Sequence, residues 1–491
     1  MSDILGAVLE ACERTPEAPA MTLGRRTLSF GRLRDRVLGV AGALEREGFV
    51  PGDRVLFSVR PGLDGICLAL GIIAAGGTVV FADPGAGEAM FRARAGLADP
   101  RWVAAEAVLY AASSGPLRGI ARRRGLELPD YASVVPHARH IVAGPRLRGV
   151  PKGALSLGRL LGGAAGALRG DPRGEALIIF TSGTTQAPKA VVHSRSSLGA
   201  GLGDFAEAVG FVPGERVLTD QLMVGIPALI GGAHWVLPPT GADPGARPKR
   251  YLPLLAEANV LFAVPAALDA LLRMDAAAPR LRMLLIGGAP VLRPLLERAR
   301  ARFPRAAIRA IYGMTEILPV AIADGDAKLA FVGAGDDVGE LMRTVAATVV
   351  DGELVLAGPG LALGYLGQPP LERLATGDLA RLNGRRLVLA GRAKDMFIRG
   401  TTNVYPGLYE PVIASLAGVD EAALVGVPNE IGDDAIVLAY VGEADQASIA
   451  GALPGLIDAA VLPDRIVRLE ALPRKGRSGK LDRAALAEAL R

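Results

Sequence analysis

Residues 178–189 read Ile-Ile-Phe-Thr-Ser-Gly-Thr-Thr-Gln-Ala-Pro-Lys, an apolar run that passes directly into hydroxyl side chains, a glycine and a lysine. The apolar part is typical of a core β-strand, and the part after it has the residues of a phosphate-binding loop. Small residues let backbone N–H groups approach phosphate oxygens, hydroxyls add donors, and a lysine supplies positive charge. A turn rich in serine and threonine would have the same composition without that function. The segment lacks the G-x-x-x-x-G-K-[ST] spacing, which disfavours a Walker-type nucleotidase.

The sequence on both sides of this loop alternates between strand-like and helical patterns. Ser29 can cap a helix whose apolar residues recur from Leu33 to Leu44 and which ends at Gly48. Another helical pattern covers residues 290–303, and strand-like runs occupy residues 54–59, 176–180, 260–264, 283–286 and 308–312. Alternating strands and helices predict parallel, doubly wound sheets.

The most apolar run of the chain, residues 65–81, is interrupted by Gly71, Gly76 and Gly77. A buried helix followed by a core strand explains it better than a membrane span. After Gly352 the pattern changes to short strands. Residues 379–382 and 387–390 flank Asn383-Gly384, a dipeptide typical of β-hairpins, so we expect a β-rich subdomain here.

Length and charge narrow the class of protein. With 491 residues the chain can form a large domain and a small one, each with a buried core. Lys and Arg total 55 against 50 Asp and Glu, so we expect no concentrated basic face and no nucleic-acid binding. Cys12 and Cys67 lack a paired spacing, and the chain does not open on a basic-then-apolar signal. These features favour a protein of the reducing cytoplasm.

Five further segments resemble, in the same order along the chain, the motifs of a known superfamily. They are residues 287–290 (Gly-Gly-Ala-Pro), 312–316 (Tyr-Gly-Met-Thr-Glu), 376–378 (Thr-Gly-Asp), 391–395 (Gly-Arg-Ala-Lys-Asp) and 476–480 (Gly-Arg-Ser-Gly-Lys). With the loop at 178–189 they resemble the adenylate-forming superfamily of acyl-CoA synthetases, peptide-synthetase adenylation domains and luciferases. The resemblance implies an ATP-dependent ligase that activates a carboxylic acid as acyl-AMP.

The same resemblance implies an α/β fold with a large N-terminal domain of two parallel α/β subdomains and a β-rich subdomain. A small, mobile α+β C-terminal domain follows. We expect the AMP-binding adenylation domain at residues 1–393 and the lid domain, which carries the catalytic lysine, at residues 394–491. Lys394 occupies the family's hinge position.

The resemblance also implies which residues bind the nucleotide. Tyr312 offers a flat face to adenine, and Asp378 and Arg392 can hydrogen-bond the ribose. The segments around them supply phosphate and adenine contacts. The expected nucleotide-binding residues are Thr181, Ser182, Gly183, Thr184, Thr185, Lys189, Gly288, Ala289, Pro290, Tyr312, Gly313, Met314, Thr315, Asp378, Arg392 and Lys480.

Four residues are expected to act on the reacting groups: Lys480, Glu316, Lys189 and Thr184. Glu316 can hold Mg²⁺ against phosphate oxygens, and it is the expected metal ligand. Lys480 can bridge the carboxylate, α-phosphate and ribose oxygens as charge builds up during attack. Without the other motifs in the same order, each of these residues would be interpreted as an ordinary solvated charge or as part of the first turn of a helix.

Three positions depart from the family's common pattern. Gln186 stands where Gly is common, Ala190 follows Lys189 where Gly is common, and Asn403 stands where Arg is frequent. The nucleotide chemistry stays plausible with these changes. Gln186 could alter the mobility of the loop and the release of pyrophosphate.

Substrate choice is expected to depend on residues 219–239, the 287–289 loop and the turn around Met314. The expected lining residues are Leu222, Met223, Val224, Gly225, Gly287 and Met314. Their apolar character favours a hydrophobic acid, although packing in a core explains each of them equally well. Asp220 could hold an amino group, but its position at a strand end favours a structural role.

The acyl acceptor is less well specified. The ending at residues 472–483 resembles ligases that transfer the acyl group to CoA or to the phosphopantetheine of an acyl-carrier protein. Residues 81–85, 227–229 and 315–321 resemble β-lactone synthetases, in which the hydroxyl of a 3-hydroxy acid displaces AMP. A non-catalytic nucleotide-binding sensor is the alternative from another class. The joint presence of Lys189, Glu316, Asp378, Arg392 and Lys480 argues against it.

Overall fold

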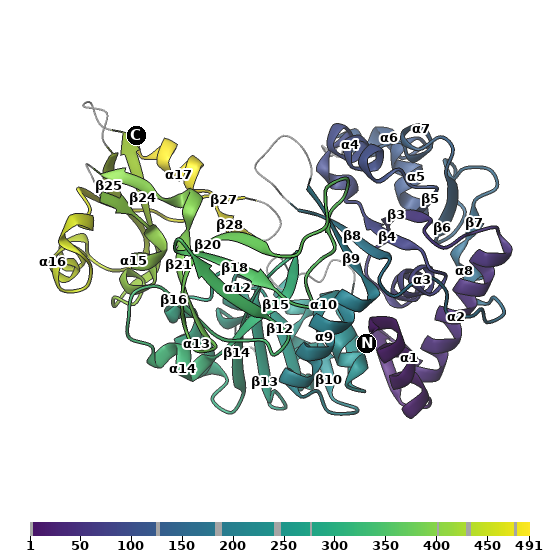
Figure 1. Ribbon diagram of the computed structural model, residues 1–491, viewed down its shortest axis with the longest axis horizontal. Coiled ribbons are helices and arrows are strands. Elements are labelled where there is room, and N and C mark those ends of the chain that lie inside the picture. Colours follow the sequence, from purple (N-terminus) through teal and green to yellow (C-terminus); the bar gives the residue numbers. More distant parts are fainter. Residues whose placement is uncertain are drawn as a thin grey trace. The chain divides into compact units, whose positions relative to one another are not determined.

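The computed structural model describes residues 3–123, 128–181, 189–239, 247–274, 277–399, 402–428, 434–475 and 479–491. The chain forms two compact units (Figure 1). The first contains residues 1–239, 314–318 and 359–372, and the second contains residues 240–313, 319–358 and 373–491. The boundary expected after residue 393 falls inside the second unit, and a domain division at that residue stays a prediction.

The first unit is built on a sheet of order β19-β9-β8-β4-β3-β5-β6-β7. Its strands are β3 (Arg54–Ser58), β4 (Thr78–Phe81), β5 (Trp102–Glu106), β6 (Arg139–Ala143), β7 (Leu155–Ser156), β8 (Glu175–Thr181), β9 (Lys189–Ser194) and β19 (Gly364–Tyr365). Strands β3 to β8 run parallel, as the sequence predicts. Strand β9 returns antiparallel to β8, because residues 182–188 are too few for a parallel crossover of about a dozen residues.

Helices cover both faces of this sheet. The helices of the first unit are α1 (Ile4–Arg14), α2 (Phe30–Arg46), α3 (Leu63–Ala74), α4 (Glu88–Ala98), α5 (Ala107–Ser113), α6 (Arg118–Arg123), α7 (Tyr131–Val134), α8 (Leu157–Leu161), α9 (Arg195–Val209) and α10 (Leu222–Ile230). Successive residues of a strand point to opposite faces. Accordingly, Val55 and Phe57 pack in one core cluster with α2 and α3, whereas Leu56 packs in another with α4 and α5.

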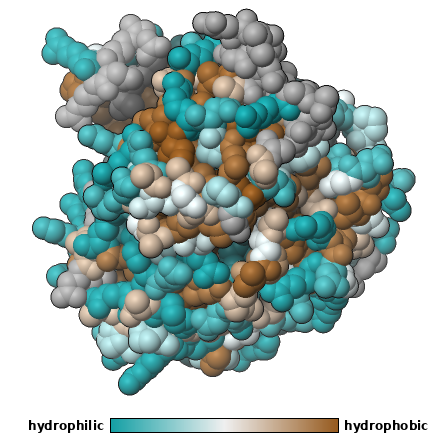
Figure 2. All heavy atoms as spheres, turned by 90° about the vertical axis from the view of Figure 1, so that its left-hand side faces the viewer, coloured by the Kyte–Doolittle hydropathy of each residue, from teal (hydrophilic) through white to brown (hydrophobic). Residues whose placement is uncertain are grey.

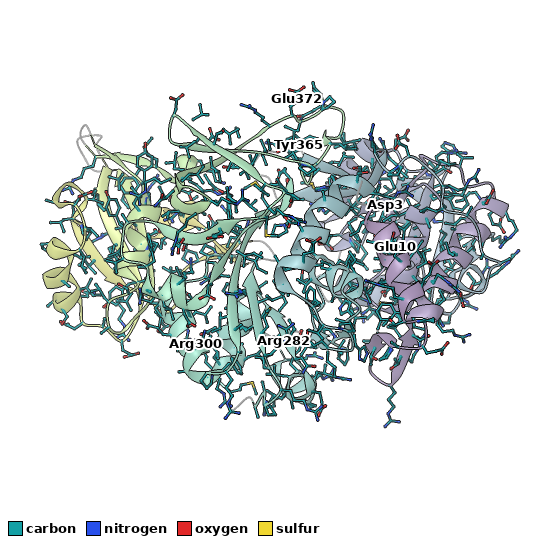
Figure 3. The ribbon with its side chains drawn as sticks, turned by 60° about the horizontal axis from the view of Figure 1, so that its bottom comes forward. Asp3, Glu10, Arg282, Arg300, Tyr365 and Glu372 are labelled. Carbon is teal, nitrogen blue, oxygen red and sulfur yellow. The ribbon has the colours of Figure 1, made fainter. Side chains whose placement is uncertain are left out.

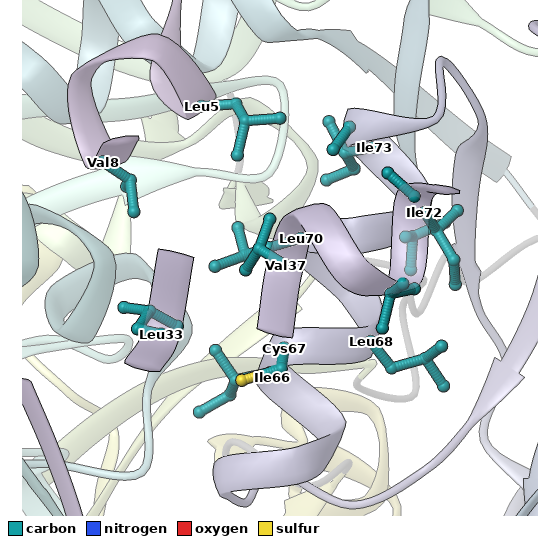
Figure 4. Packing of buried hydrophobic residues seen from close by; sticks show 14 of the residues in the cluster. Leu5, Val8, Leu33, Val37, Ile66, Cys67, Leu68, Leu70, Ile72 and Ile73 are labelled. Carbon is teal, nitrogen blue, oxygen red and sulfur yellow. The ribbon is translucent and has the colours of Figure 1, made fainter. Parts of the chain in front are cut away.

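The expected helix after Ser29 is confirmed. The Ser29 side chain accepts a hydrogen bond from the Arg32 backbone N–H, and Gly48 after the helix has φ +81°. Figure 4 shows Leu33 and Val37 of this helix in the cluster that also contains Leu5 of α1 and Leu70 of α3. The run at residues 65–81 is likewise a buried helix and a core strand. Within the described residues, no helix is both long and apolar enough to span a membrane.

The first unit also contains a second group of strands, β10 (Arg216–Leu218), β11 (His234–Leu237), β1 (Pro19–Leu23) and β2 (Arg26–Ser29). Strands β10, β11 and β1 are parallel, and β2 folds back antiparallel on β1. Trp235 on β11 is fully buried, and its Nε1 donates to the carbonyl oxygen of Thr219 at 2.9 Å. This bond ties the strand to the segment that precedes α10.

The second unit contains strands in the order β17-β18-β20-β21-β16-β15-β14-β13-β12. They are β12 (Val260–Ala263), β13 (Met283–Gly287), β14 (Ala307–Met314), β15 (Ile317–Asp324), β16 (Asp336–Leu341), β17 (Ala346–Val350), β18 (Glu353–Ala357), β20 (Leu374–Asn383) and β21 (Arg386–Arg392). Strands β12 to β14 are parallel, and the β-rich part expected after Gly352 is antiparallel. The accompanying helices are α11 (Leu252–Glu257), α12 (Pro265–Leu272), α13 (Arg293–Arg302) and α14 (Gly325–Ala330).

The expected hairpin joins β20 and β21, but its turn lies one residue later than the sequence suggests. Asn383 pairs with Arg386, so the turn residues are Gly384 and Arg385. Gly384 has φ +59°, a value that glycine adopts without strain.

The C-terminal residues of the second unit have their own small sheet and cores. The sheet consists of β24 (Val419–Pro428), β25 (Asp434–Gly442) and β26 (Arg465–Arg468). Two further pairs of strands are β22 (Phe397–Arg399) with β23 (Thr402–Val404) and β27 (Arg474–Lys475) with β28 (Lys480–Leu481). The helices are α15 (Pro406–Ile413), α16 (Gln446–Ala452) and α17 (Arg483–Ala489). Two clusters of buried residues lie on the two faces of β24 and β25. On the molecular face drawn in Figure 2, hydrophobic patches are separated by hydrophilic residues.

Candidate active site

The phosphate-loop segment is flanked by two neighbouring strands of the first unit. Thr181, the last residue of β8, pairs with Lys189, the first residue of β9. The two ends of the segment are therefore held side by side. The expected loop residues Ser182, Gly183, Thr184 and Thr185 lie outside the described residues, as does Gln186.

Lys189 and Glu316 both contact one tyrosine. The hydroxyl of Tyr365 donates to Oε1 of Glu316 at 2.8 Å, and Nζ of Lys189 lies 5.6 Å from the centroid of the same ring. A cation at that distance from an aromatic face is attracted by the ring. Tyr365, which no motif predicted, thus links Lys189 and Glu316, whose motifs are far apart in the sequence.

A buried histidine fixes the backbone beside Glu316. Nε2 of His193 is 2.7 Å from the carbonyl oxygen of Thr315, and Nδ1 is 3.2 Å from Oγ of Ser197. Burial lowers the pKa of His193, although the Thr315 carbonyl and Glu316 act in the opposite direction. A neutral imidazole that donates from Nε2 and accepts at Nδ1 satisfies both contacts. His193 was not identified from the sequence, although it lies on the strand that begins at Lys189, the last residue of the phosphate-loop segment.

In the second unit, Tyr312, Asp378 and Arg392 form one cluster. The Tyr312 hydroxyl donates to Oδ2 of Asp378 at 2.5 Å, and Nε of Arg392 lies 2.7 Å from Oδ1. Asp378 is only 3% exposed. Its pKa is raised by burial, while the charges of Arg392 and Lys480 and the Tyr312 hydrogen bond oppose that increase. The three expected ribose and adenine residues are therefore assembled around one buried carboxylate, and Lys480 is close enough to act on its charge.

The turn before Asp378 is held by three hydrogen bonds. The Thr376 hydroxyl donates to the carbonyl oxygen of Leu354 and accepts from the Asp378 N–H, and the Gly377 N–H donates to Glu353. Gly377 has φ +72°, which a side chain would strain. The backbone thus fixes the direction of the carboxylate.

The expected adenine-side loop follows the carboxyl end of β13. Gly287 pairs with Ile311 of the parallel strand β14, which places the loop and the residue before Tyr312 at the same edge. Ligands of α/β sheets commonly bind at such carboxyl ends. Gly288 has φ +85° and is exposed, and Ala289 is half-buried.

Four of the expected substrate residues, Leu222 to Gly225, lie on α10 of the first unit, whereas Gly287 ends β13 and Met314 ends β14. Leu222 and Met223 are half-buried, whereas Val224 and Gly225 are buried. A Cβ atom at Gly225 would lie 2.1 Å from the indole of Trp235. The space on that side of Gly225 is therefore filled by protein, and a lining role for the neighbouring side chains stays a prediction. Asp220 is exposed and accepts a hydrogen bond from the side chain of Gln221.

A pocket of about 390 Å³ lies elsewhere in the first unit. Residues 106–108 and 143–145 line it together with Arg60 and Leu147. It contains none of the motif residues, so it does not bear on the expected chemistry.

Glu316 suits a magnesium ion that arrives with the nucleotide. Among the described residues, no three His, Cys, Asp or Glu side chains gather into a metal-binding group. Mg²⁺ is commonly held by one or two carboxylates together with phosphates and water rather than by a protein cage. A single carboxylate with one oxygen fixed by Tyr365 fits that pattern.

A family model described as "AMP-binding enzyme" matches residues 8–366. The chain belongs to this family. This AMP-binding enzyme is therefore a member of the family that contains the AMP-forming acid–thiol ligases. The expectation of an AMP-forming ligase is confirmed at that level.

Individual relatives resemble this AMP-binding enzyme along its whole length. Tyrocidine synthase 3 of Brevibacillus parabrevis is 27% identical over 519 residues, which cover 97% of this chain but only 8% of that protein. A 3-[(3aS,4S,7aS)-7a-methyl-1,5-dioxo-octahydro-1H-inden-4-yl]propanoyl:CoA ligase of Mycobacterium tuberculosis (strain ATCC 25618 / H37Rv) is 28% identical over 96% of each chain.

The crystal structure of ATP-bound MatB from Rhodopseudomonas palustris superposes with a TM-score of 0.81 at 23% identity. The match covers 100% of this chain and 99% of that chain. It confirms the fold class, a large N-terminal domain followed by a small α+β domain, with mixed rather than purely parallel sheets. The narrower resemblance to β-lactone synthetases has no counterpart among these relatives.

Proposed function

We propose that this enzyme converts a hydrophobic carboxylic acid into its acyl-AMP and then transfers the acyl group to the thiol of CoA or of a carrier protein. The observation that carries the proposal is the buried Asp378, which Tyr312 and Arg392 hold from two sides and whose charge Lys480 influences. A fixed carboxylate can accept hydrogen bonds from ribose hydroxyls, and a nearby ammonium can balance charge at the α-phosphate.

In the first step, a carboxylate oxygen of the acid forms a bond to the α-phosphorus of ATP, and the bond to pyrophosphate breaks. Lys480 balances the negative charge that develops on the oxygens around phosphorus. Lys189 supplies positive charge to the leaving pyrophosphate. Mg²⁺, when bound at Glu316, neutralises phosphate charge.

The half-buried Leu222 and Met223 support a hydrophobic acid, because neither offers a partner for a charged group. The sequence of residues 472–483 supports a thiol acceptor, because it resembles that of acyl-CoA and acyl-carrier ligases. A relative that is 28% identical over 96% of each chain is named as a CoA ligase, which also supports it. The acid itself stays open within this class.

The test is acid-dependent exchange of labelled pyrophosphate into ATP, measured with a panel of aliphatic, aromatic and 3-hydroxy acids. We expect exchange with at least one hydrophobic acid and its loss in Glu316→Ala. Exchange with none of the acids would favour a nucleotide-binding sensor.

A second assay identifies the acceptor. Thioester formation is measured with CoA and with a phosphopantetheinylated carrier protein, using the acid that supports exchange. Stoichiometric AMP release from a 3-hydroxy acid without any thiol would instead indicate closure to a β-lactone.

A further inference from the structure

Tyr365 contacts both charged residues of the proposed polyphosphate site. It belongs to the segment 359–372, on which Figure 3 labels Tyr365 and Glu372. Strand β19 pairs Tyr365 with Val191 of β9, and the Leu366 N–H donates to the carbonyl oxygen of Ala190 at 2.8 Å. The phenol is therefore fixed to the strand that begins at Lys189.

The same segment also holds the backbone of Glu316. The Ala362 N–H donates to the carbonyl oxygen of Glu316 at 2.8 Å, and Leu361 forms a β-bridge with Ile317. One short stretch of chain thus connects the strand of Lys189 to the segment of Glu316, and Tyr365 is the side chain on it that contacts both charges.

The two contacts use different parts of the tyrosine. Its hydroxyl donates to Oε1 of Glu316 at 2.8 Å, and its ring face receives the ammonium of Lys189 at 5.6 Å. Burial, with a contribution from Glu316, raises the pKa of Tyr365 to about 12, so the hydroxyl remains a donor at neutral pH.

We propose that Tyr365 is a positioning residue that keeps Glu316 oriented for Mg²⁺ and prevents Lys189 from pairing with it. A direct ion pair between the two would neutralise the charges that the phosphates and the metal ion require. The tyrosine gives each of them another partner, the hydroxyl for the carboxylate and the π face for the ammonium. Among the described residues the hydrogen bond to Glu316 uses only Oε1, which leaves the other carboxylate oxygen for the cation. The inference rests on the proposed function.

The experiment compares Tyr365→Phe and Tyr365→Leu with the wild type in pyrophosphate exchange at increasing Mg²⁺. Tyr365→Phe keeps the ring and removes the hydroxyl, so we expect the half-saturating Mg²⁺ concentration to rise about tenfold, as for other residues that orient metal ligands. The rate at saturating Mg²⁺ should stay within about twofold. Tyr365→Leu removes both contacts, so its saturating rate should fall as well.

Tyr409→Phe is the matched control. The Tyr409 hydroxyl donates to Oδ2 of Asp458, also at 2.8 Å, but neither residue belongs to the proposed site. Its Mg²⁺ dependence should equal that of the wild type. An unchanged Mg²⁺ dependence in Tyr365→Phe, or an equal shift in Tyr409→Phe, would overturn the proposal.

A binding measurement separates this inference from the proposed function. Electron paramagnetic resonance of Mn²⁺ with ATP reports the affinity of the metal–nucleotide complex without any turnover. Absence of exchange with every acid would refute the proposed reaction, yet weaker Mn²⁺–ATP binding in Tyr365→Phe would still support the role of Tyr365. Equal affinities in wild type and variant would refute that role.

Discussion

The Tyr312 hydroxyl and the Asp378 carboxylate are joined by a hydrogen bond of 2.5 Å inside the second unit. Arg392 holds the other carboxylate oxygen at 2.7 Å, so both oxygens already have a partner in the protein. A ribose hydroxyl that binds Asp378 must therefore share a carboxylate oxygen with Tyr312 or Arg392, or take the place of one of them.

Tyr312→Phe keeps the aromatic face and removes that hydroxyl. We expect the free variant to be about 1.5–3 kcal/mol less stable, the usual cost of losing a hydrogen bond to a charged group. The increase in melting temperature on adding ATP should exceed that of the wild type, because the ribose can then supply the missing donor. Melting curves with and without ATP measure both effects. Equal increments in variant and wild type would contradict ribose binding at this oxygen.

His234 gives the first unit a defined dependence on pH. It lies on β11, is 6% exposed, and its Nε2 is 2.7 Å from Oγ1 of Thr22. Burial, with the positive charge of Arg216, lowers the pKa of His234 to about 4. Below about pH 6.5 the unfolded chain takes up a proton that the folded chain does not, so this contribution to stability is complete above that pH and declines toward pH 4.

Urea unfolding of the wild type and His234→Gln between pH 7.5 and pH 5 tests this. Between these two pH values the free energy of unfolding of the wild type should fall by about 1–2 kcal/mol more than that of the variant. Each pH unit below the unfolded-state pKa lowers it by up to about 1.4 kcal/mol. His137 is exposed, and His137→Gln should behave like the wild type. If the free energy of unfolding fell with pH equally in His234→Gln and in the wild type, His234 would not be the source of this pH dependence.

Local sequence patterns predicted the structure correctly where one helix or one hairpin contains the whole pattern. The cap at Ser29 and the apolar spacing after it specify α2, and the glycine after Asn383 specifies the hairpin. The turn was displaced by one residue because register depends on cross-strand packing rather than on the dipeptide. The antiparallel return of β9 follows from the shortness of residues 182–188, a constraint that the alternating pattern does not express.

The candidate site was only partly predictable for a related reason. Motifs identified Glu316 and Asp378, because each lies in a short run of characteristic residues. Tyr365 is separated from Glu316 by 49 positions, and His193 contacts the carbonyl of a residue 122 positions away. Such partners are determined by strand pairing, which composition and spacing do not reveal.

Lys480 should be the most sensitive residue of the adenylation step. We expect Lys480→Ala to slow pyrophosphate exchange at least about a hundredfold, since losing one preorganised donor at a transition state costs about 3–4 kcal/mol. Lys475 is its cross-strand neighbour and pairs with Asp482 at 3.1 Å. Lys475→Ala is therefore the matched control, and its exchange should remain close to that of the wild type. Near-normal exchange in Lys480→Ala would remove this residue from the step.

The last prediction concerns Lys394, the expected hinge. If one small domain presents Lys480 for adenylation, it cannot also admit a thiol through the same face, so we expect the proposed second step to require a rotation. Lys394 is exposed in the short helical turn Ala393–Asp395, and Arg483 contacts the next residue, Asp395, at 3.3 Å. Backbone rotation at residue 394 would therefore carry the C-terminal residues with it.

Lys394→Pro should leave acyl-AMP formation largely intact and strongly reduce thioester formation, because proline fixes φ and restricts the residue before it. Lys394→Ala removes the side chain but leaves the backbone free, so both steps should persist. Single-turnover assays started with acid and ATP, or with isolated acyl-AMP and CoA, measure the two steps separately. Loss of both steps in Lys394→Pro, or of neither, would refute the hinge. Equal thioester loss in Lys394→Ala would assign the effect to the ammonium group rather than to backbone rotation.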